Sequence, residues 1–89
     1  MKIRASHILV QNQYEAEDLI RKLEAGDDFS ELARKFSLCP SRQVGGELGE
    51  FGRGRMVEAF ETAAFALTVG QISGPVRTPF GYHLIRRDA

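Results

Sequence analysis

Three side chains in this sequence are of the imidazole or thiol type, which can transfer protons, bind soft metal ions or act as nucleophiles near neutral pH. They are the only two histidines, His7 and His83, and the only cysteine, Cys39. Each histidine begins a short apolar run, "HILV" near the start and "HLI" near the end, that is typical of a buried strand. An imidazole inside a strand costs free energy unless a polar partner satisfies it. We therefore expect both histidines to have hydrogen-bonding partners.

The residues alone leave three interpretations of this set open. A zinc site would need a fourth ligand, and the close ligand pairs of structural zinc sites are absent from the sequence. A Cys–His nucleophile pair would need a third group to orient the imidazole, and no obvious one accompanies it. The simplest alternative is a buried Cys39, acting as a small apolar side chain, beside two hydrogen-bonded core histidines.

The glycine-rich stretch "GGELGEFGRGR", residues 45–55, invites comparison with nucleotide-binding loops. It contains no G-x-G-x-x-G pattern. Its nearest approach to a P-loop, Gly49 to Gly54, is followed by Arg55 and Met56 where lysine and a hydroxyl residue are needed. We interpret these glycines as residues that allow unusual backbone angles in a loop.

Apolar spacing predicts a strand and then a helix at the start of the chain. Residues 3–10 form the predicted strand, with Ile3, Ala5, His7 and Leu9 on one face and Ile8 and Val10 on the other. Asn12 is suited to cap a helix that runs to about Ala25, and Gly26 is suited to end it.

A second helix is predicted over residues 29–36, because Asp28 precedes it and Glu31 follows three positions later, as in a capping box. Residues 37–56 are too irregular for a helix and too long for a turn, although residues 48–51 fit a short strand.

The last third of the chain predicts a helix and two strands. Helical spacing resumes at Met56 and continues to Leu67, and Gly70 stops it. A short strand is expected within residues 71–76, and the final strand at residues 82–87. This order favours an α+β fold with an antiparallel sheet, in which the two histidine-bearing strands are central neighbours.

Composition limits the classes of function. The 89 residues suit one small domain, 1–89, and the 43% apolar and 27% charged content is that of an ordinary globular chain. The formal net charge is zero, so a nucleic-acid or anionic-lipid surface is disfavoured. No run approaches the roughly 18 apolar residues of a membrane span, and no signal peptide is evident. A cytoplasmic location is expected, with which the single cysteine agrees.

Four stretches taken together carry a resemblance to a known family. They are "SHILV", "SLCPS", "GGELGEFGRGRMVEAFE" and "GPVRTPFGYHLI", in this order and over essentially the whole chain. The sequence resembles the parvulin family of peptidyl-prolyl isomerases, of the small, non-phosphate-directed branch. The resemblance implies a four-stranded antiparallel sheet surrounded by about four helices, an architecture similar to that of FKBP. It also implies cis/trans isomerisation of X-Pro bonds with no cofactor and no metal.

The resemblance also implies roles for eight residues. His7 and His83 would be the paired histidines of the central strands, Cys39 the cleft cysteine, and Thr78 the hydroxyl that joins their hydrogen-bond network. The expected proline pocket consists of Leu48, Met56, Phe60 and Phe80. Met56 and Phe60 are four residues apart, so in a continuous helix they would share one face.

The implied substrates are proline-containing segments of unfolded or nascent polypeptides, bound by a monomer that needs neither nucleic acid nor membrane. The loop that holds phosphate-binding arginines in the phosphate-directed branch is acidic here, with no basic residue between Val10 and Arg21. The alternative is a non-catalytic peptide-binding or chaperone domain of the same fold. We favour the enzyme because the whole set of site residues is present.

Overall fold

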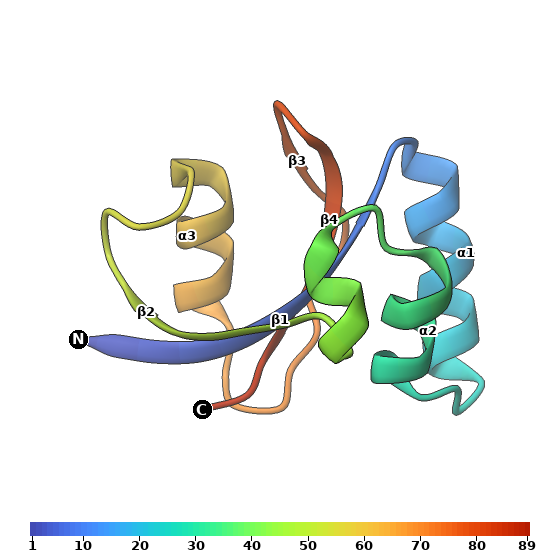
Figure 1. Cartoon of the computed structure of the whole chain (residues 1–89), viewed down its shortest axis with the longest axis horizontal. Helices are drawn as coiled ribbons and strands as arrows, with labels where there is room; N and C mark the ends of the chain where they lie inside the picture. Colours follow the sequence, from blue (N-terminus) through green and yellow to red (C-terminus); the bar gives the residue numbers. More distant parts are fainter.

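A computed structural model describes residues 1–89 and shows an antiparallel sheet with helices on both sides (Figure 1). The four strands are ordered β2-β1-β4-β3, so β1 and β4 lie in the centre. In chain order the elements are β1 (Lys2–Val10), α1 (Gln13–Glu24), α2 (Phe29–Phe36), the 3-10 helix η1 (Pro40–Val44), β2 (Glu47–Gly52), α3 (Glu58–Ala66), β3 (Val76–Thr78) and β4 (Gly81–Arg87). The predicted α+β class is confirmed.

The two central strands place the histidines on one face of the sheet. In the β1–β4 register His7 lies opposite Ile85, and His83 lies opposite Leu9. The two histidines are therefore diagonal neighbours, with side chains directed to the same side. The prediction that the histidine strands are central neighbours is confirmed.

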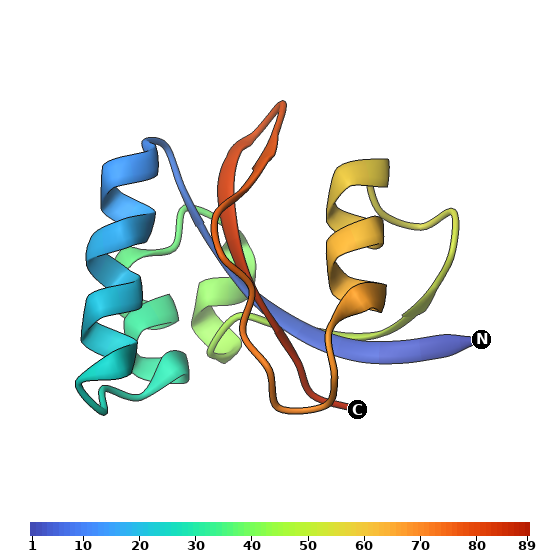
Figure 2. The same cartoon turned by 180° about the vertical axis from the view of Figure 1, so that it is seen from behind.

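Different helices cover the two faces of this sheet. Helices α1 and α2 lie on one side of the central strands and α3 lies on the other, as both views show (Figure 1, Figure 2). On the α1/α2 face the core comprises Ile8, Val10, Ala16, Leu19, Phe29, Leu32, Ala33 and Leu84. On the α3 face it comprises Ile3, Ala5, Phe51, Phe60, Ala64, Leu67 and Ile85. The alternation of apolar residues along β1 accounts for both cores.

The predicted starts of the first two helices are present. Asn12 and Glu15 form a capping box at the start of α1. The side chain of Asp28 accepts a hydrogen bond from the backbone N–H of Glu31 at 3.1 Å. Each of these contacts satisfies a backbone donor that the first turn of a helix leaves free.

No helix in the structure is both long and apolar enough to span a bilayer.

Two predicted boundaries near α3 are wrong. The helix begins at Glu58, because Val57 is extended with ψ of 148°, so Met56 precedes the helix rather than sharing its face with Phe60. It ends at Ala66, where Leu67 is again extended, before Gly70. The acidic residues of its first turn suit the positive end of the helix dipole. The structure has three α-helices and one short 3-10 helix, where about four helices were expected.

The third strand is also displaced from its predicted position. It covers residues 76–78, whereas residues 71–75 contribute only a single bridge, between Ile72 and Arg86. The hydroxyl of Ser73 accepts the N–H of Ile85, and thereby replaces a backbone carbonyl of a regular ladder. Pro75 has no N–H to donate. These two features delay regular pairing until Val76.

Candidate active site

A largely apolar pocket of about 510 Å³ opens on the α3 face of the sheet. It is lined by His7, Leu9, Leu38, Cys39, Pro40, Leu48, Arg55, Met56, Val57, Phe60, Phe80 and His83. Six different parts of the fold contribute: β1, β4, the segment that joins α2 to η1 with the first residue of η1, β2, the segment before α3 with the first turn of α3, and the β3–β4 turn. The pocket therefore depends on the complete fold rather than on one local motif.

The two histidines are joined directly at the base of this pocket. Their Nδ1 atoms are 2.9 Å apart, and their rings lie nearly parallel, at 18°. The Nε2 atom of His83 is 2.7 Å from the hydroxyl of Thr78, which also accepts the backbone N–H of Phe80 at 3.2 Å. Thr78 is itself buried and lies behind His83, outside the lining of the pocket.

The short contact between the two Nδ1 atoms requires one shared proton. One imidazole must donate and the other accept, because two N–H groups would repel each other and two lone pairs would not bond. The Nε2 atom of His7 is buried and has no hydrogen-bond partner. Hydrogen bonds therefore run from the N–H of Phe80 through Thr78 and His83 to His7. They end at Nε2 of His7, which has no partner.

Burial keeps both imidazoles neutral at physiological pH. Removal from water lowers the pKa of His7 from 6.5 to about 4, and the nearby His83 adds to this effect. Removal from water likewise lowers the pKa of His83 to about 4. The base of the pocket is therefore polar but uncharged.

Phe60 fixes the orientation of the histidine pair. Its ring meets those of His7 and His83 edge-on, at centroid distances of 5.5 and 5.2 Å and at 81° in each case. Phe60 is 3% exposed and also packs near Phe51. Edge-to-face contacts of this kind add to the free energy of apolar burial.

Gly46 allows β2 to approach the backbone of His7 closely. The N–H of His7 donates to the carbonyl oxygen of Gly46 at 2.9 Å, at the point where the β1–β2 register shifts after Ala5. Gly46 has φ of +87°, and a Cβ at this position would lie 2.4 Å from the oxygen of His7. A larger residue would therefore displace the strand that carries His7.

Ser37 holds the segment that carries Cys39 against β1. Its buried hydroxyl accepts the N–H groups of Leu9, at 3.1 Å, and of Cys39, at 3.3 Å. Leu38 also donates its N–H to the oxygen of Leu9 at 2.8 Å. These bonds place the half-buried Cys39 at the pocket wall.

Seven of the eight predicted site residues line the pocket, and Thr78 supports it from behind. Prediction from sequence missed five lining residues: Leu9, Leu38, Pro40, Arg55 and Val57. Leu9 could have been found, because it alternates with His7 on one strand face. Leu38 and Pro40 flank Cys39 in sequence and could have been included on that basis.

The histidine pair and Cys39 do not form a metal site in this geometry. No group of three or more His, Cys, Asp or Glu side chains is placed to hold a metal ion. The two Nδ1 atoms, which would be candidate ligands, are directed at each other.

Comparison with known proteins assigns the family. Residues 7–89 match the family model described as "Rotamase: PPIC-type PPIASE domain". The foldase protein PrsA of a Geobacillus species (strain WCH70) is 54% identical over 86 residues, which are 96% of this chain and 31% of that protein. The chain belongs to the PPIC-type peptidyl-prolyl isomerase family, the parvulins. It spans about a third of the length of the curated relatives that it matches.

Solved structures agree with this assignment. PrsA from Bacillus subtilis matches with a TM-score of 0.97 and 46% identity, over 99% of this chain and 35% of that chain. The parvulin of Nitrosopumilus maritimus matches with a TM-score of 0.90 and 46% identity, over 99% of this chain and 96% of that one. The resemblance to the parvulin family is confirmed.

Proposed function

We propose that this chain catalyses cis/trans isomerisation of X-Pro bonds in flexible or unfolded polypeptides, at the pocket on the α3 face. The observation that carries the proposal is the neutral His7–His83 pair at the base of an apolar pocket. The family assignment supports the same activity. Assistance to protein folding follows, because X-Pro isomerisation is slow enough to limit folding.

The reaction breaks no covalent bond. Rotation about the amide has a barrier of about 18–20 kcal/mol, because the resonance of the planar bond is lost during the twist. An enzyme lowers this barrier when it binds the twisted amide better than either planar isomer. The twisted amide has less charge separation than the planar one, so an apolar site stabilises it relative to water.

The pocket offers separate surfaces for the proline ring and for the amide. Leu48, Met56 and Phe60 supply apolar contacts that suit a pyrrolidine ring, and the exposed Phe80 lies at the edge. Cys39, His7 and His83 supply polar groups around the amide carbonyl, and both imidazoles are neutral. We assign these seven residues and Thr78 to substrate binding and catalysis.

The proposed activity needs neither a cofactor nor a thiol nucleophile. An X-Pro peptide with a chromogenic leaving group should isomerise faster with the chain present, and treatment with a chelator should leave this acceleration unchanged. Cys39→Ser and Cys39→Asp should retain measurable turnover, since rotation needs no covalent intermediate. Loss of activity after chelation, restored by zinc, would overturn the metal-free account. A covalent adduct in mass spectra, with no turnover in either variant, would overturn the non-covalent one.

We propose substrates without a required phosphate. The start of α1 carries Glu15, Glu17 and Asp18 and no basic residue before Arg21, so it would repel a phosphorylated side chain. Arg53 is paired with the carboxylate of Glu61 at 3.5 Å. A Leu-Pro peptide should therefore be isomerised at least as well as a phosphoserine-Pro peptide.

The same pocket could serve a non-catalytic peptide-binding domain of this fold. That alternative predicts binding of proline peptides without faster exchange.

We further propose that the chain is a monomer that binds neither nucleic acid nor membranes. Gel filtration tests the oligomeric state, titration with DNA tests nucleic-acid binding, and sedimentation with vesicles tests membrane binding. The cytoplasmic location stays a prediction, to be tested by cell fractionation.

A further inference from the structure

We propose that Arg55 gives this pocket a preference for substrates that carry a carboxylate next to the proline. This inference rests on the proposed isomerase function and names the substrate class of the same site. Among the twelve lining residues Arg55 is the only one with a permanent charge. All other lining side chains are apolar, apart from the two histidines and the thiol of Cys39.

Arg55 has no partner within the chain. Its guanidinium makes no ion pair and no side-chain hydrogen bond, and the residue is exposed. The carboxylate of Glu61, which contacts the same loop, is already paired. One of its carboxylate oxygens accepts the N–H of Gly54 at 2.5 Å, and the other faces Arg53. Arg55 is thus available to a ligand.

Arg53 shows by contrast that this loop separates two arginines with different tasks. Arg53 lies over the ring of Phe65 at 4.4 Å and pairs with Glu61, which fixes it to α3 outside the pocket. Two residues further on, Arg55 lies in the pocket wall beside Met56 and Val57. Arg53 attaches the loop to α3, whereas Arg55 lines the proposed substrate pocket.

The chemistry of one guanidinium favours a carboxylate. Its planar donors match a carboxylate in a two-pronged hydrogen bond, and the apolar surroundings strengthen the attraction relative to open water. A phosphate of charge about −1.5 to −2 would be only partly neutralised by a single arginine.

Two peptide series test the inference, one varying the residue before proline and one the residue after it. Each series contains Glu, Gln and Lys at that position, and a phosphoserine peptide is added. Turnover is measured as kcat/KM at low and at moderate salt. The variant is Arg55→Gln. The matched control is Arg42→Gln, since Arg42 is also exposed and unpaired but does not line the pocket.

In one of the two series the wild-type chain should prefer Glu to Gln by about three- to fivefold, mainly through KM, and salt should reduce this ratio. Arg55→Gln should bring the ratio to about one, whereas Arg42→Gln should leave it unchanged. The phosphoserine peptide should not exceed the Glu peptide. An unchanged Glu/Gln ratio in Arg55→Gln, a preference for Lys, or a phosphoserine peptide far better than Glu would each overturn the inference. If the Gln peptides are not accelerated at all, the proposed function itself fails.

Discussion

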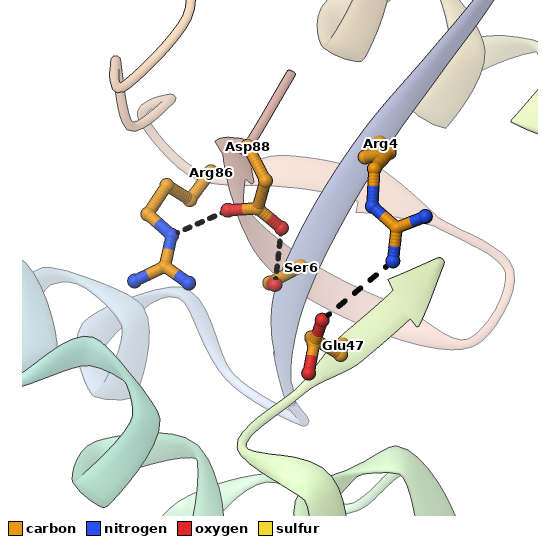
Figure 3. Close-up of polar contacts among 5 residues, drawn as sticks. All are labelled: Arg4, Ser6, Glu47, Arg86 and Asp88. Carbon is orange, nitrogen blue, oxygen red and sulfur yellow. Dashed lines mark hydrogen bonds and ion pairs between the residues drawn. The ribbon is translucent and has the colours of Figure 1, made fainter. Parts of the chain in front are cut away.

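The two faces of β1 and β4 each carry a polar side-chain network. In the half-buried network of Ser6, Arg86 and Asp88, here called the closed network, every member has a partner, whereas the buried histidine network on the other face leaves one nitrogen unpaired. On the α1/α2 face the hydroxyl of Ser6 donates to Asp88 at 2.6 Å, and Nε of Arg86 donates to the other oxygen of the same carboxylate at 2.7 Å (Figure 3). The guanidinium of Arg86 also lies over the ring of Phe29 at 4.7 Å. The network ties the end of the chain to β1.

The network on the α3 face ends differently. His7, His83 and Thr78 are joined, yet Nε2 of His7 has no partner and a pocket lies above the pair. Two helices cover the α1/α2 face, whereas α3 alone covers the other (Figure 2). The pocket occupies the uncovered part of the second face, and it is where we propose that the substrate binds. On this proposal the same two strands provide stability on one side and chemistry on the other.

Matched aromatic substitutions provide the largest contrast between the faces. Phe60→Leu and Phe29→Leu each truncate a ring that is 3% exposed, so each should lower the free energy of unfolding by about 1–3 kcal/mol. Phe60→Leu should also reduce kcat/KM by about 10- to 100-fold, because the histidine pair and the proline pocket lose their support. Phe29→Leu should keep kcat/KM within about twofold. Denaturant unfolding measures the change in stability, and the peptide assay measures the change in kcat/KM. Equal losses of activity in the two variants would contradict the division of the sheet into a stabilising face and a catalytic face.

Acid should destabilise the fold through His7 and His83, the two buried histidines on the α3 face. The pKa of each histidine is about 4 in the folded chain and about 6.5 when unfolded, so the unfolded chain binds more protons between these values. Stability should therefore be full above pH 6.5 and fall as the pH decreases toward 4, by at most about 1.4 kcal/mol per pH unit for each histidine.

Activity should follow the folded-state values in the same range. Because both imidazoles stay neutral, kcat/KM should be flat from about pH 8 to pH 5. Histidine ring NMR signals followed against pH report the two pKa values directly. A titration of either signal near pH 6.5, or a step in kcat/KM there, would contradict the neutral pair.

Opening the closed network should affect stability alone. Asp88→Asn removes the charge that Arg86 and the hydroxyl of Ser6 share, which should cost about 1–3 kcal/mol of unfolding free energy. The isomerase activity per folded molecule should not change. A Ser6→Ala variant and the double variant complete a cycle that measures the coupling. A marked loss of kcat/KM in Asp88→Asn would show that the two faces are not independent.

The smallest effect is expected at the exposed edge of the sheet. Arg4 and Glu47 form an ion pair at 3.9 Å between β1 and β2, with both side chains at least half exposed (Figure 3). Arg4→Gln should change the unfolding free energy by about 1 kcal/mol or less and leave activity unaltered. A larger loss in thermal unfolding would mean that β2 depends on this pair.

The residues alone predicted that both histidines need polar partners and that their strands are central neighbours, because these signals are local and repeated. The resemblance implied that the two histidines form a pair, and their Nδ1 atoms lie 2.9 Å apart. Asn12 and Asp28 were likewise identified from the residues that follow them. Resemblance supplied the rest of the site, since the residues alone left three interpretations of His7, His83 and Cys39 open.

Features that depend on contacts between distant segments were not predicted. The closed network joins Ser6 to Asp88 across 82 positions, and neither residue type indicates a partner at that distance. The short strand β3 begins late because Ser73 and Pro75 disturb pairing, which no apolar pattern reveals. Met56 reaches the pocket from the loop before α3 rather than from a helix face. In the sequence, Arg55 stood out only as a departure from the P-loop pattern.

The central claim is that the α3 face, which carries the pocket, is the catalytic one. NMR exchange spectroscopy with a Leu-Pro peptide and the isotope-labelled chain tests this claim most directly. A small amount of the chain should broaden the cis and trans signals of the peptide or produce exchange cross-peaks between them. In the reverse experiment the amide signals that shift should be those around His7, Cys39, Met56 and Phe60. Signals around Leu19 and Phe29 should stay in place. Faster exchange without shifts at the pocket, or binding at the pocket without faster exchange, would contradict the account.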